Sequence, residues 1–118
     1  MVARLSKPAL QKIMSGKVKD AATIVVKFYG NRCHFCHALK EPYESLSEEY
    51  SDVFFFAFNA EDYPDLGRIL NFEGVPTICL MKVGDNKPRI KVMAEPEEPH
   101  PDTWYDVPNI KTFIDKEK

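Results

Sequence analysis

The sequence predicts an α/β fold built as a single domain over residues 1–118, in which a central mixed β-sheet of about five strands is flanked by about four helices. Apolar runs alternate along the chain with stretches of helical periodicity, and glycine and proline mark the boundaries between them. A chain of 118 residues with 44% hydrophobic residues can bury one modest core and no more. Together these observations predict one small domain of alternating helices and strands.

The first helix is expected to begin after Ser6 and to end at Gly16. Ser6 is a good N-cap, Pro8 suits the first helical turn, and glycine is typical of a helix C-terminus. The apolar run that follows, from Thr23 to Tyr29, does not alternate with polar residues. Such a run is typical of a central strand that is covered on both faces.

The middle of the chain continues this alternation of helices and strands. From Cys36 onward, apolar side chains recur at spacings of three and four residues, which indicates an amphipathic helix. Its apolar positions are Leu39, Tyr43, Leu46 and Tyr50. A strand over Val53 to Phe58, a short helix over Pro64 to Leu70 and a strand over Thr77 to Val83 are expected next.

The C-terminal part is expected to contain an edge strand, a loop and a last helix. Gly84-Asp85-Asn86 is a turn signal, and Arg89 to Met93 alternates as an edge strand does. The segment Glu95 to Asp102 is rich in proline and acidic residues, so an exposed loop is expected there. Asp106 can cap the last helix. The apolar positions of that helix are Val107, Ile110, Phe113 and Ile114.

Composition excludes several classes of function. The net charge is −2 and no basic block with interleaved aromatics occurs, which argues against a nucleic-acid partner. No run of about 18 apolar residues could span a membrane, and Met1 to Gly16 lacks the long apolar core of a signal peptide. We therefore expect a cytoplasmic monomer without a cofactor or a metal. With three cysteines and one close pair, the chain cannot be a disulfide scaffold.

Cys33 and Cys36 form a Cys-x-x-Cys pair where the apolar run from Thr23 to Tyr29 gives way to the amphipathic helix. At a helix N-terminus the free backbone N–H groups and the helix dipole favour an anion. A thiol placed there therefore loses its proton more easily than a free cysteine, whose pKa is roughly 8.5. The pair is a candidate nucleophile.

A second motif, Gly74-Val75-Pro76-Thr77, opens another apolar run later in the chain. The order strand, dithiol, helix, strand, helix, Val-Pro-Thr, strand resembles the thioredoxin superfamily, which includes thioredoxin and protein disulfide isomerase-like domains. The resemblance covers roughly residues 4 to 94. It implies that the dithiol caps the second helix and that Pro76 is a cis-proline beside the cysteines. Asn59 to Pro64 resembles the family's turn into its third helix, and Pro42 resembles its helix-kinking proline.

The resemblance implies thiol–disulfide exchange with protein disulfides or dithiols as the activity. Cys33 would attack and form the mixed disulfide, and Cys36 would resolve it. A thioredoxin reductase or an equivalent electron donor is the implied partner that restores the dithiol. The expected substrate-groove residues are Arg32, His34, Phe35, Val75 and Pro76.

The residues around the dithiol depart from ordinary thioredoxin, whose motif resembles Trp-Cys-Gly-Pro-Cys-Lys. This chain has Arg32-Cys33-His34-Phe35-Cys36-His37. His34 places a titratable cation beside the nucleophile, and Arg32, His37 and Lys40 add positive potential that favours the thiolate. Because a stabilised thiolate makes the disulfide a stronger oxidant, we expect the pair to be more oxidising than thioredoxin. Alternatively, both histidines are solvated without an electrostatic role, and Phe35 shapes substrate access.

Lys27 lies where the family usually buries an acid beneath the cysteines. That carboxylate is thought to accept the proton of the resolving thiol, so this chain lacks the usual general base. A charged lysine would lower the pKa of both thiols, whereas a desolvated, neutral lysine could itself serve as the base. The remaining alternative is that Lys27 extends to water from the end of its strand.

Cys79, the third cysteine, lies between Ile78 and Leu80 in an expected strand. Free cysteine behaves as a small hydrophobic residue when it is buried. We therefore expect Cys79 to fill the core without redox activity.

The dithiol motif also fits functions other than exchange. Cys33 to His37 also fits the C-x-x-C-H motif of haem attachment, with Met81, Met93 or His100 as conceivable distal ligands. An exported haem protein would need a signal peptide and usually an all-helical pattern, which argues against it. A structural zinc site needs four ligands, and no second cysteine pair is present. A non-catalytic binding module within a larger assembly is the remaining alternative, although the intact dithiol argues against it.

Overall fold

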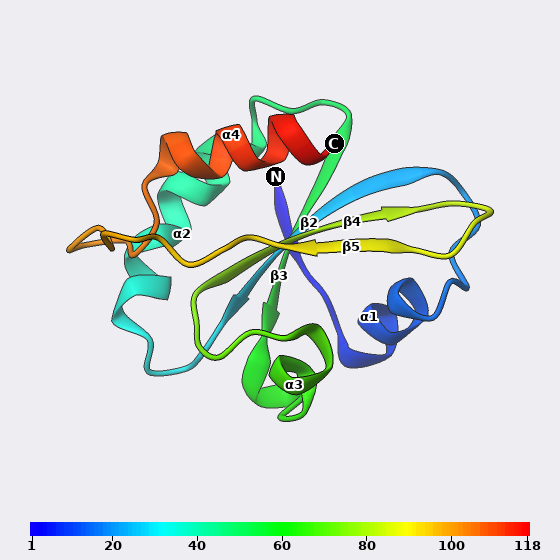
Figure 1. Cartoon of the computed structure of the whole chain (residues 1–118), viewed down its shortest axis with the longest axis horizontal. Coiled ribbons are helices and arrows are strands. Elements are labelled where there is room, and N and C mark those ends of the chain that lie inside the picture. Colours follow the sequence, from blue (N-terminus) through cyan, green and yellow to red (C-terminus); the bar gives the residue numbers. More distant parts are fainter.

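The computed structural model describes all 118 residues and contains a five-stranded mixed sheet with helices on both faces (Figure 1). The strands are β1 (Val2–Arg4), β2 (Ala22–Tyr29), β3 (Val53–Asn59), β4 (Thr77–Val83) and β5 (Arg89–Val92). The helices are α1 (Lys7–Met14), α2 (His34–Ser47), α3 (Leu66–Leu70) and α4 (Val107–Glu117), with a 3₁₀ turn, η1 (Ala60–Asp62), after β3. The predicted fold class is confirmed. None of the helices is long and apolar enough to cross a membrane.

The strand order across the sheet is β1-β3-β2-β4-β5. β2 pairs in parallel with β3 and antiparallel with β4, while β1 joins β3 in parallel and β5 joins β4 antiparallel. The central position of β2 explains its sequence, because every residue from Ile24 to Phe28 is buried. The dithiol therefore lies shortly after the central strand of the sheet.

Two apolar cores, one on each face, hold the helices to the sheet. One core packs α2 and α4 against inward-facing residues such as Val25, Phe55 and Leu80. The other packs α1 and α3 against Val26, Phe28 and Met81. Figure 1 shows the same division, with α2 and α4 on one side of the strands and α1 and α3 on the other. Alternate residues of a strand thus serve opposite cores.

Helix α1 has the boundaries that its capping residues predict. The Ser6 Oγ accepts a hydrogen bond of 3.2 Å from the backbone N–H of Ala9, which satisfies one of the free donors of the first turn. After the helix, Gly16 adopts a φ of +80°, a left-handed conformation that costs glycine little.

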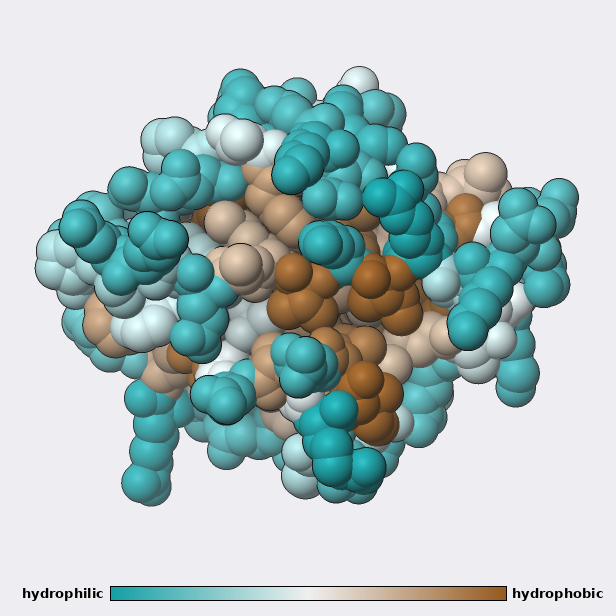
Figure 2. Space-filling view, in the orientation of Figure 1, coloured by the Kyte–Doolittle hydropathy of each residue, from teal (hydrophilic) through white to brown (hydrophobic).

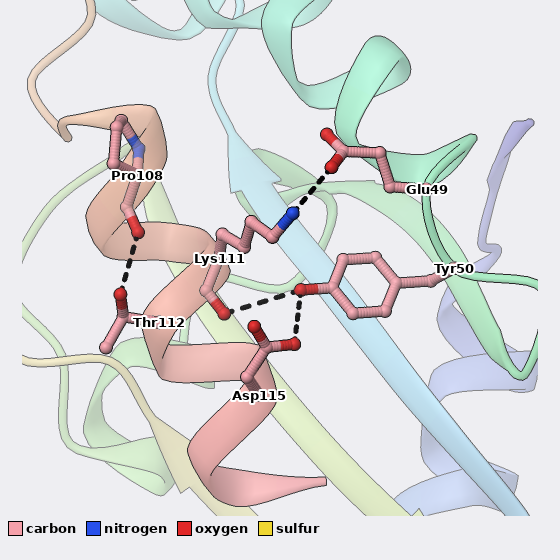
Figure 3. Close-up of polar contacts among 6 residues, drawn as sticks. All are labelled: Glu49, Tyr50, Pro108, Lys111, Thr112 and Asp115. Atoms are coloured by element: carbon pink, nitrogen blue, oxygen red, sulfur yellow. Dashed lines mark hydrogen bonds and ion pairs between the residues drawn. The ribbon is translucent and has the colours of Figure 1, made fainter.

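Polar contacts join the last helix, α4, to the turn that follows α2 (Figure 3). The Tyr50 hydroxyl donates a 2.6 Å hydrogen bond to Asp115 Oδ1, and Lys111 Nζ lies 2.7 Å from Glu49 Oε1. Tyr50 is only 8% exposed, whereas Lys111 and Glu49 are both about half exposed. The buried phenol is therefore expected to contribute more to stability than the exposed ion pair.

Several element boundaries differ from the sequence-based expectation. The sequence pattern does not predict β1, because three residues are too few to show periodicity. The third helix begins at Leu66 rather than Pro64, and β5 ends at Val92. Asp106 does occupy the N-cap of α4, but its side chain makes no capping hydrogen bond. α2 continues through Pro42 without ending there.

A groove lies between the edge strand β5 and α3, and none of the three cysteines lines it. Its apolar lining includes Ile69, Leu70, Ile90 and Val92. Figure 2 shows that apolar side chains gather near the middle of this face, in the region between β5 and α3, while the periphery is mostly hydrophilic. β5 contributes to this surface because its apolar residues, Ile90 and Val92, alternate with exposed polar residues and are only partly covered at the edge of the sheet.

Candidate active site

Cys33 and Cys36 form a disulfide at the N-terminus of α2, with their Cα atoms 5.2 Å apart. Cys33 is the N-cap residue, and its Sγ accepts a hydrogen bond of 3.0 Å from the backbone N–H of Cys36. Cys33 is partly exposed, whereas Cys36 is only 4% exposed. An incoming disulfide can therefore reach the first sulfur but not the second.

The loop that carries Cys33 is held by side chains at the carboxyl ends of β2 and β3. The Glu61 carboxylate accepts a hydrogen bond from the backbone N–H of Asn31, and Asn59 Nδ2 donates to Asn31 Oδ1 at 2.7 Å. The Asn59 Oδ1 also accepts from the backbone N–H of Glu61 at 3.0 Å, which caps η1. Parallel pairing brings these two strand ends together, so the turn after β3 supports the loop before the dithiol.

The Val-Pro-Thr motif, which precedes and begins β4, lies beside the dithiol. The Val75–Pro76 peptide bond is cis, and the Val75 carbonyl oxygen lies 3.6 Å from Cys33 Sγ. In the disulfide this sulfur carries no proton, so the contact becomes a possible hydrogen bond only when Cys33 is a thiol. The Thr77 hydroxyl donates to the carbonyl of Gly74, which holds the turn that presents the motif.

A shallow depression beside Cys33 contains most of the predicted groove residues. Arg32, His34, Phe35 and Val75 all line it. Pro76 is buried and does not line the depression, although it fixes the neighbouring Val75. The structure thus brings four of the five groove residues to one open surface around the accessible sulfur.

The loop between β5 and α4 supplies an aromatic residue that the sequence analysis did not identify. The ring of Trp104 packs on Phe35, with ring centroids 5.4 Å apart. Backbone hydrogen bonds of 2.9 and 3.0 Å pair His100 with Trp104, and His100 Nδ1 accepts from the backbone N–H of Asp102 at 3.0 Å. A lone tryptophan next to the proline-rich segment was the available signal. Its partner could be found only from the three-dimensional structure.

A second cavity, which we call the rear pocket, lies behind the dithiol and has a volume of about 440 Å³. Both cysteines reach it, and so do Lys27, His37 and Lys40. Its other charged lining residues are Arg4, Glu41 and Glu44. The predicted modulating residues therefore divide between two sides of the disulfide, with His34 and Phe35 in front and Lys27 and His37 behind.

Lys27 is buried within the sheet face and does not extend freely to water, since it is only 4% exposed. Its amine takes part in no side-chain hydrogen bond or ion pair of the protein, and Nζ lies 5.1 Å from the centroid of the Tyr43 ring. Burial and the nearby Lys40 lower the pKa of Lys27 to about 8, although Glu44 opposes this shift. At neutral pH the amine is therefore still mostly protonated.

Cys79 is a core residue, as the sequence indicates. It is fully buried in the core shared with α1 and α3, and burial raises the pKa of its thiol to about 12. A thiol of such high pKa forms little thiolate at neutral pH and is a poor nucleophile. No group of three or more histidine, cysteine or acidic side chains is arranged to hold a metal ion.

Residues 6–99 of the chain match the family model for thioredoxin. This chain belongs to the thioredoxin family. It is 33% identical to human thioredoxin over 82 residues, which cover 67% of this chain and 73% of the human protein. It is 32% identical to thioredoxin AMT13 of Alternaria alternata over 69 residues. That match spans 58% of this chain and 58% of the fungal protein.

Solved structures support the fold. A chain in the crystal structure of ferredoxin:thioredoxin reductase with thioredoxin f2 superposes with a TM-score of 0.71 at 23% identity, over 98% of this chain and 93% of that one. At this identity the likeness shows the fold alone. Family membership and the Cys33–Cys36 pair together support thiol–disulfide oxidoreduction as the general activity.

Proposed function

We propose that this thioredoxin-family protein exchanges electrons with disulfides of other proteins, with Cys33 as nucleophile and Cys36 as resolving residue. The observation that carries the proposal is the asymmetry of the pair. Cys33 Sγ is accessible and accepts a helix N–H at 3.0 Å, while Cys36 lies behind it at 4% exposure. The accessible sulfur is also the one that the helix N-terminus stabilises as a thiolate.

The proposed exchange runs in two steps. In the first, the Cys33 thiolate attacks one sulfur of a substrate disulfide, forms a mixed disulfide with it and releases the other substrate sulfur as a thiolate. In the second, the Cys36 thiol loses its proton and its sulfur attacks Cys33 Sγ, which releases the second substrate thiolate. The substrate gains two electrons, and the protein returns to the Cys33–Cys36 disulfide seen in the structure.

The substrate surface is proposed to be the depression in front of Cys33, extended by Trp104. Arg32 and His34 are exposed there, and Phe35 and Trp104 are partly exposed. The two rings, in contact with their planes tilted by 56°, give a broad apolar area next to the nucleophile. An extended peptide lying across Val75 would place its disulfide against Cys33 Sγ, which is 3.6 Å from the Val75 carbonyl oxygen.

The dithiol is proposed to be more oxidising than that of ordinary thioredoxin, whose reduction potential is about −270 mV. Two sides of the disulfide carry cationic side chains, with Arg32 and the titratable His34 at the front depression and Lys27 and Lys40 in the rear pocket. Positive potential stabilises a thiolate and hence the reduced form. A measured potential more positive than about −270 mV is the expected result.

Lys27 is proposed to act as a charge at neutral pH rather than as a base. Its pKa of about 8 leaves most molecules protonated at pH 7, so the amine attracts both sulfurs when they ionise. Above pH 8 the neutral amine becomes available as an acceptor for the proton of Cys36. Without the family's usual buried acid, a proton acceptor for Cys36 is therefore still available, but only at a higher pH.

The electron donor is proposed to be a reductase of the thioredoxin-reductase class. The support is the general requirement that an oxidised dithiol be reduced again, together with the superposition on a chain of the ferredoxin:thioredoxin reductase complex. Reduction of the Cys33–Cys36 disulfide by a purified reductase and its cofactor, followed by thiol titration, tests this partner class directly.

Insulin reduction in the presence of a small dithiol tests the proposed activity. The wild-type chain should accelerate precipitation of the insulin B chain, Cys33→Ser should abolish that acceleration, and Cys36→Ser should accumulate a mixed disulfide with the substrate. A folded wild-type protein without activity would instead support the alternative, a non-catalytic binding module. Accumulation of the mixed disulfide by Cys33→Ser in place of Cys36→Ser would reverse the two roles.

A further inference from the structure

Sheet register places two cations on either side of a small residue at the floor of the rear pocket. Arg4 of β1 pairs with Ala57 of β3, and Ala57 pairs in turn with Lys27 of β2. Residues in register across neighbouring strands point to the same face of a sheet. Because alanine projects only a methyl group, a hollow remains above Ala57, between the longer side chains of Arg4 and Lys27.

Helix α2 forms the opposite wall of the rear pocket. His37, Lys40, Glu41 and Glu44 recur at helical spacing and all line it. The space between this wall and the sheet is about 440 Å³, within the range of roughly 300–1,000 Å³ found for small-molecule sites. Apolar atoms from Val2 and from several other lining residues contribute the rest of its surface.

Lys27 is the feature that points to a ligand. The residue is 96% buried, since only 4% of it is exposed, and its amine makes neither a side-chain hydrogen bond nor an ion pair within the protein. The Nζ atom itself is not fully enclosed, because it opens into the rear pocket. The ring of Tyr43, 5.1 Å from Nζ, and the Glu44 carboxylate compensate its charge only in part, since burial and Lys40 still lower the pKa of the amine. A largely buried charge is costly unless it is fully paired, so an anion entering the pocket would gain an attraction that the protein itself supplies only in part.

The charges of the pocket select the kind of anion. With His37 counted as neutral, the pocket lining has three cationic and two anionic side chains, and so one excess positive charge. The cations are Arg4, Lys27 and Lys40, and the anions are Glu41 and Glu44. One excess positive charge matches a monoanion better than a multiply charged phosphate. The apolar atoms of the lining favour an organic group attached to that anion.

We propose that the rear pocket binds a small organic monocarboxylate, with its carboxylate group paired to Lys27 Nζ. Binding does not require the proposed exchange activity, because it depends on the pocket of the oxidised protein alone. The organic group would occupy the hollow above Ala57, between the sheet and α2.

Binding is also expected to depend on the redox state of the dithiol, a consequence that rests on the proposed function. Cys33 and Cys36 both line the rear pocket, so a thiolate formed there would repel the bound carboxylate. By linkage, a carboxylate that binds the disulfide form more tightly must make the reduction potential more negative. An unchanged potential at saturating ligand would refute this linkage.

The test is a titration of the full-length, oxidised, ¹⁵N-labelled protein with sodium benzoate, at an ionic strength held constant with sodium chloride. Saturable shifts are expected for the backbone amides of Lys27 and Ala57. Benzyl alcohol, which has a similar shape without the charge, should bind at least tenfold more weakly. Absence of saturable shifts, or equal binding of the alcohol, would overturn the proposal.

Three variants locate the site. Lys27→Met should weaken benzoate binding at least tenfold by removing the charge, and Ala57→Leu should do so by filling the hollow while keeping every charge. Lys19→Met changes an exposed lysine outside the pocket and should bind as the wild type does. Wild-type affinity in either of the first two variants would show that benzoate binds elsewhere, and the insulin assay with the same proteins reports separately on the exchange activity.

Discussion

Replacing Lys27 by methionine is expected to stabilise the protein at neutral pH, although the lysine lies at the centre of the sheet. Methionine has a similar length and an apolar side chain, so it can occupy the same space without placing a charge there. The wild-type lysine is 4% exposed, is unpaired and has a pKa lowered from 10.5 to about 8, chiefly by burial. A lowered lysine pKa means that the folded state disfavours the charged form.

The magnitude follows from the two pKa values. Below about pH 8 the lysine is charged in both states, and the folded protein carries a penalty of roughly 3 kcal/mol at 1.36 kcal/mol per pKa unit. Between about pH 8 and 10.5 the unfolded state binds more protons, so wild-type stability rises with pH and the penalty disappears. Loss of the contact between Lys27 and the Tyr43 ring, worth about 0.5–2 kcal/mol, offsets part of the gain from methionine. The expected net stabilisation at pH 7 is about 1–3 kcal/mol.

The pH dependence gives the sharper measurement. Guanidinium unfolding of the oxidised wild type and Lys27→Met, followed by far-UV circular dichroism, should give a free-energy difference that shrinks by about 2 kcal/mol from pH 7 to pH 9.5. Groups common to both proteins cancel in this difference. The exposed Lys19→Met variant should follow the wild type at every pH. A Lys27→Met protein that is less stable than wild type at pH 7, or a difference that stays constant to pH 9.5, would refute the assigned burial and charge of Lys27.

Three further predictions concern the dithiol and the last helix. His34→Gln should make the reduction potential of the pair more negative by only about 5–20 mV, because an exposed charge near a helix N-terminus contributes about 0.3–1 kcal/mol. An unchanged potential would show that His34 does not act electrostatically. Lys27→Asp should speed resolution of a preformed mixed disulfide at pH 7 in stopped-flow measurements, because a carboxylate can accept the proton of Cys36. Slower resolution would mean that the amine already promotes this step, either as the base or through the charge that poises Cys36. Tyr50→Phe should lower the free energy of unfolding by about 1–2 kcal/mol through loss of the 2.6 Å hydrogen bond to Asp115, and a double-mutant cycle with Asp115→Asn should show coupling between the two residues.

The sequence by itself determined the elements whose signals are local. Ser6 and Gly16 mark the ends of α1 because capping depends on the residues that flank a helix. The unbroken apolar run through Val25 and Val26 indicated the doubly covered β2, and the boundaries of β4 matched its apolar run from Thr77 to Val83. The dithiol and the Val-Pro-Thr motif, taken in order with these elements, were enough to recognise the family and to select Cys33 and Cys36.

The tertiary structure decided the features that depend on contacts between distant segments. β1 is too short to be recognised alone and exists because its residues pair with β3. The contact of Trp104 with Phe35 depends on the path of the loop after β5, which no local pattern specifies. The sequence of β2 does not decide whether Lys27 reaches water or stays buried, because an apolar run that contains one lysine is compatible with both outcomes. The amine of Lys27 lies in the rear pocket because the sheet register aligns Lys27 with Ala57 and because α2 lies above both residues. Burial and neighbouring charges then lowered its pKa, and both act through space rather than along the chain.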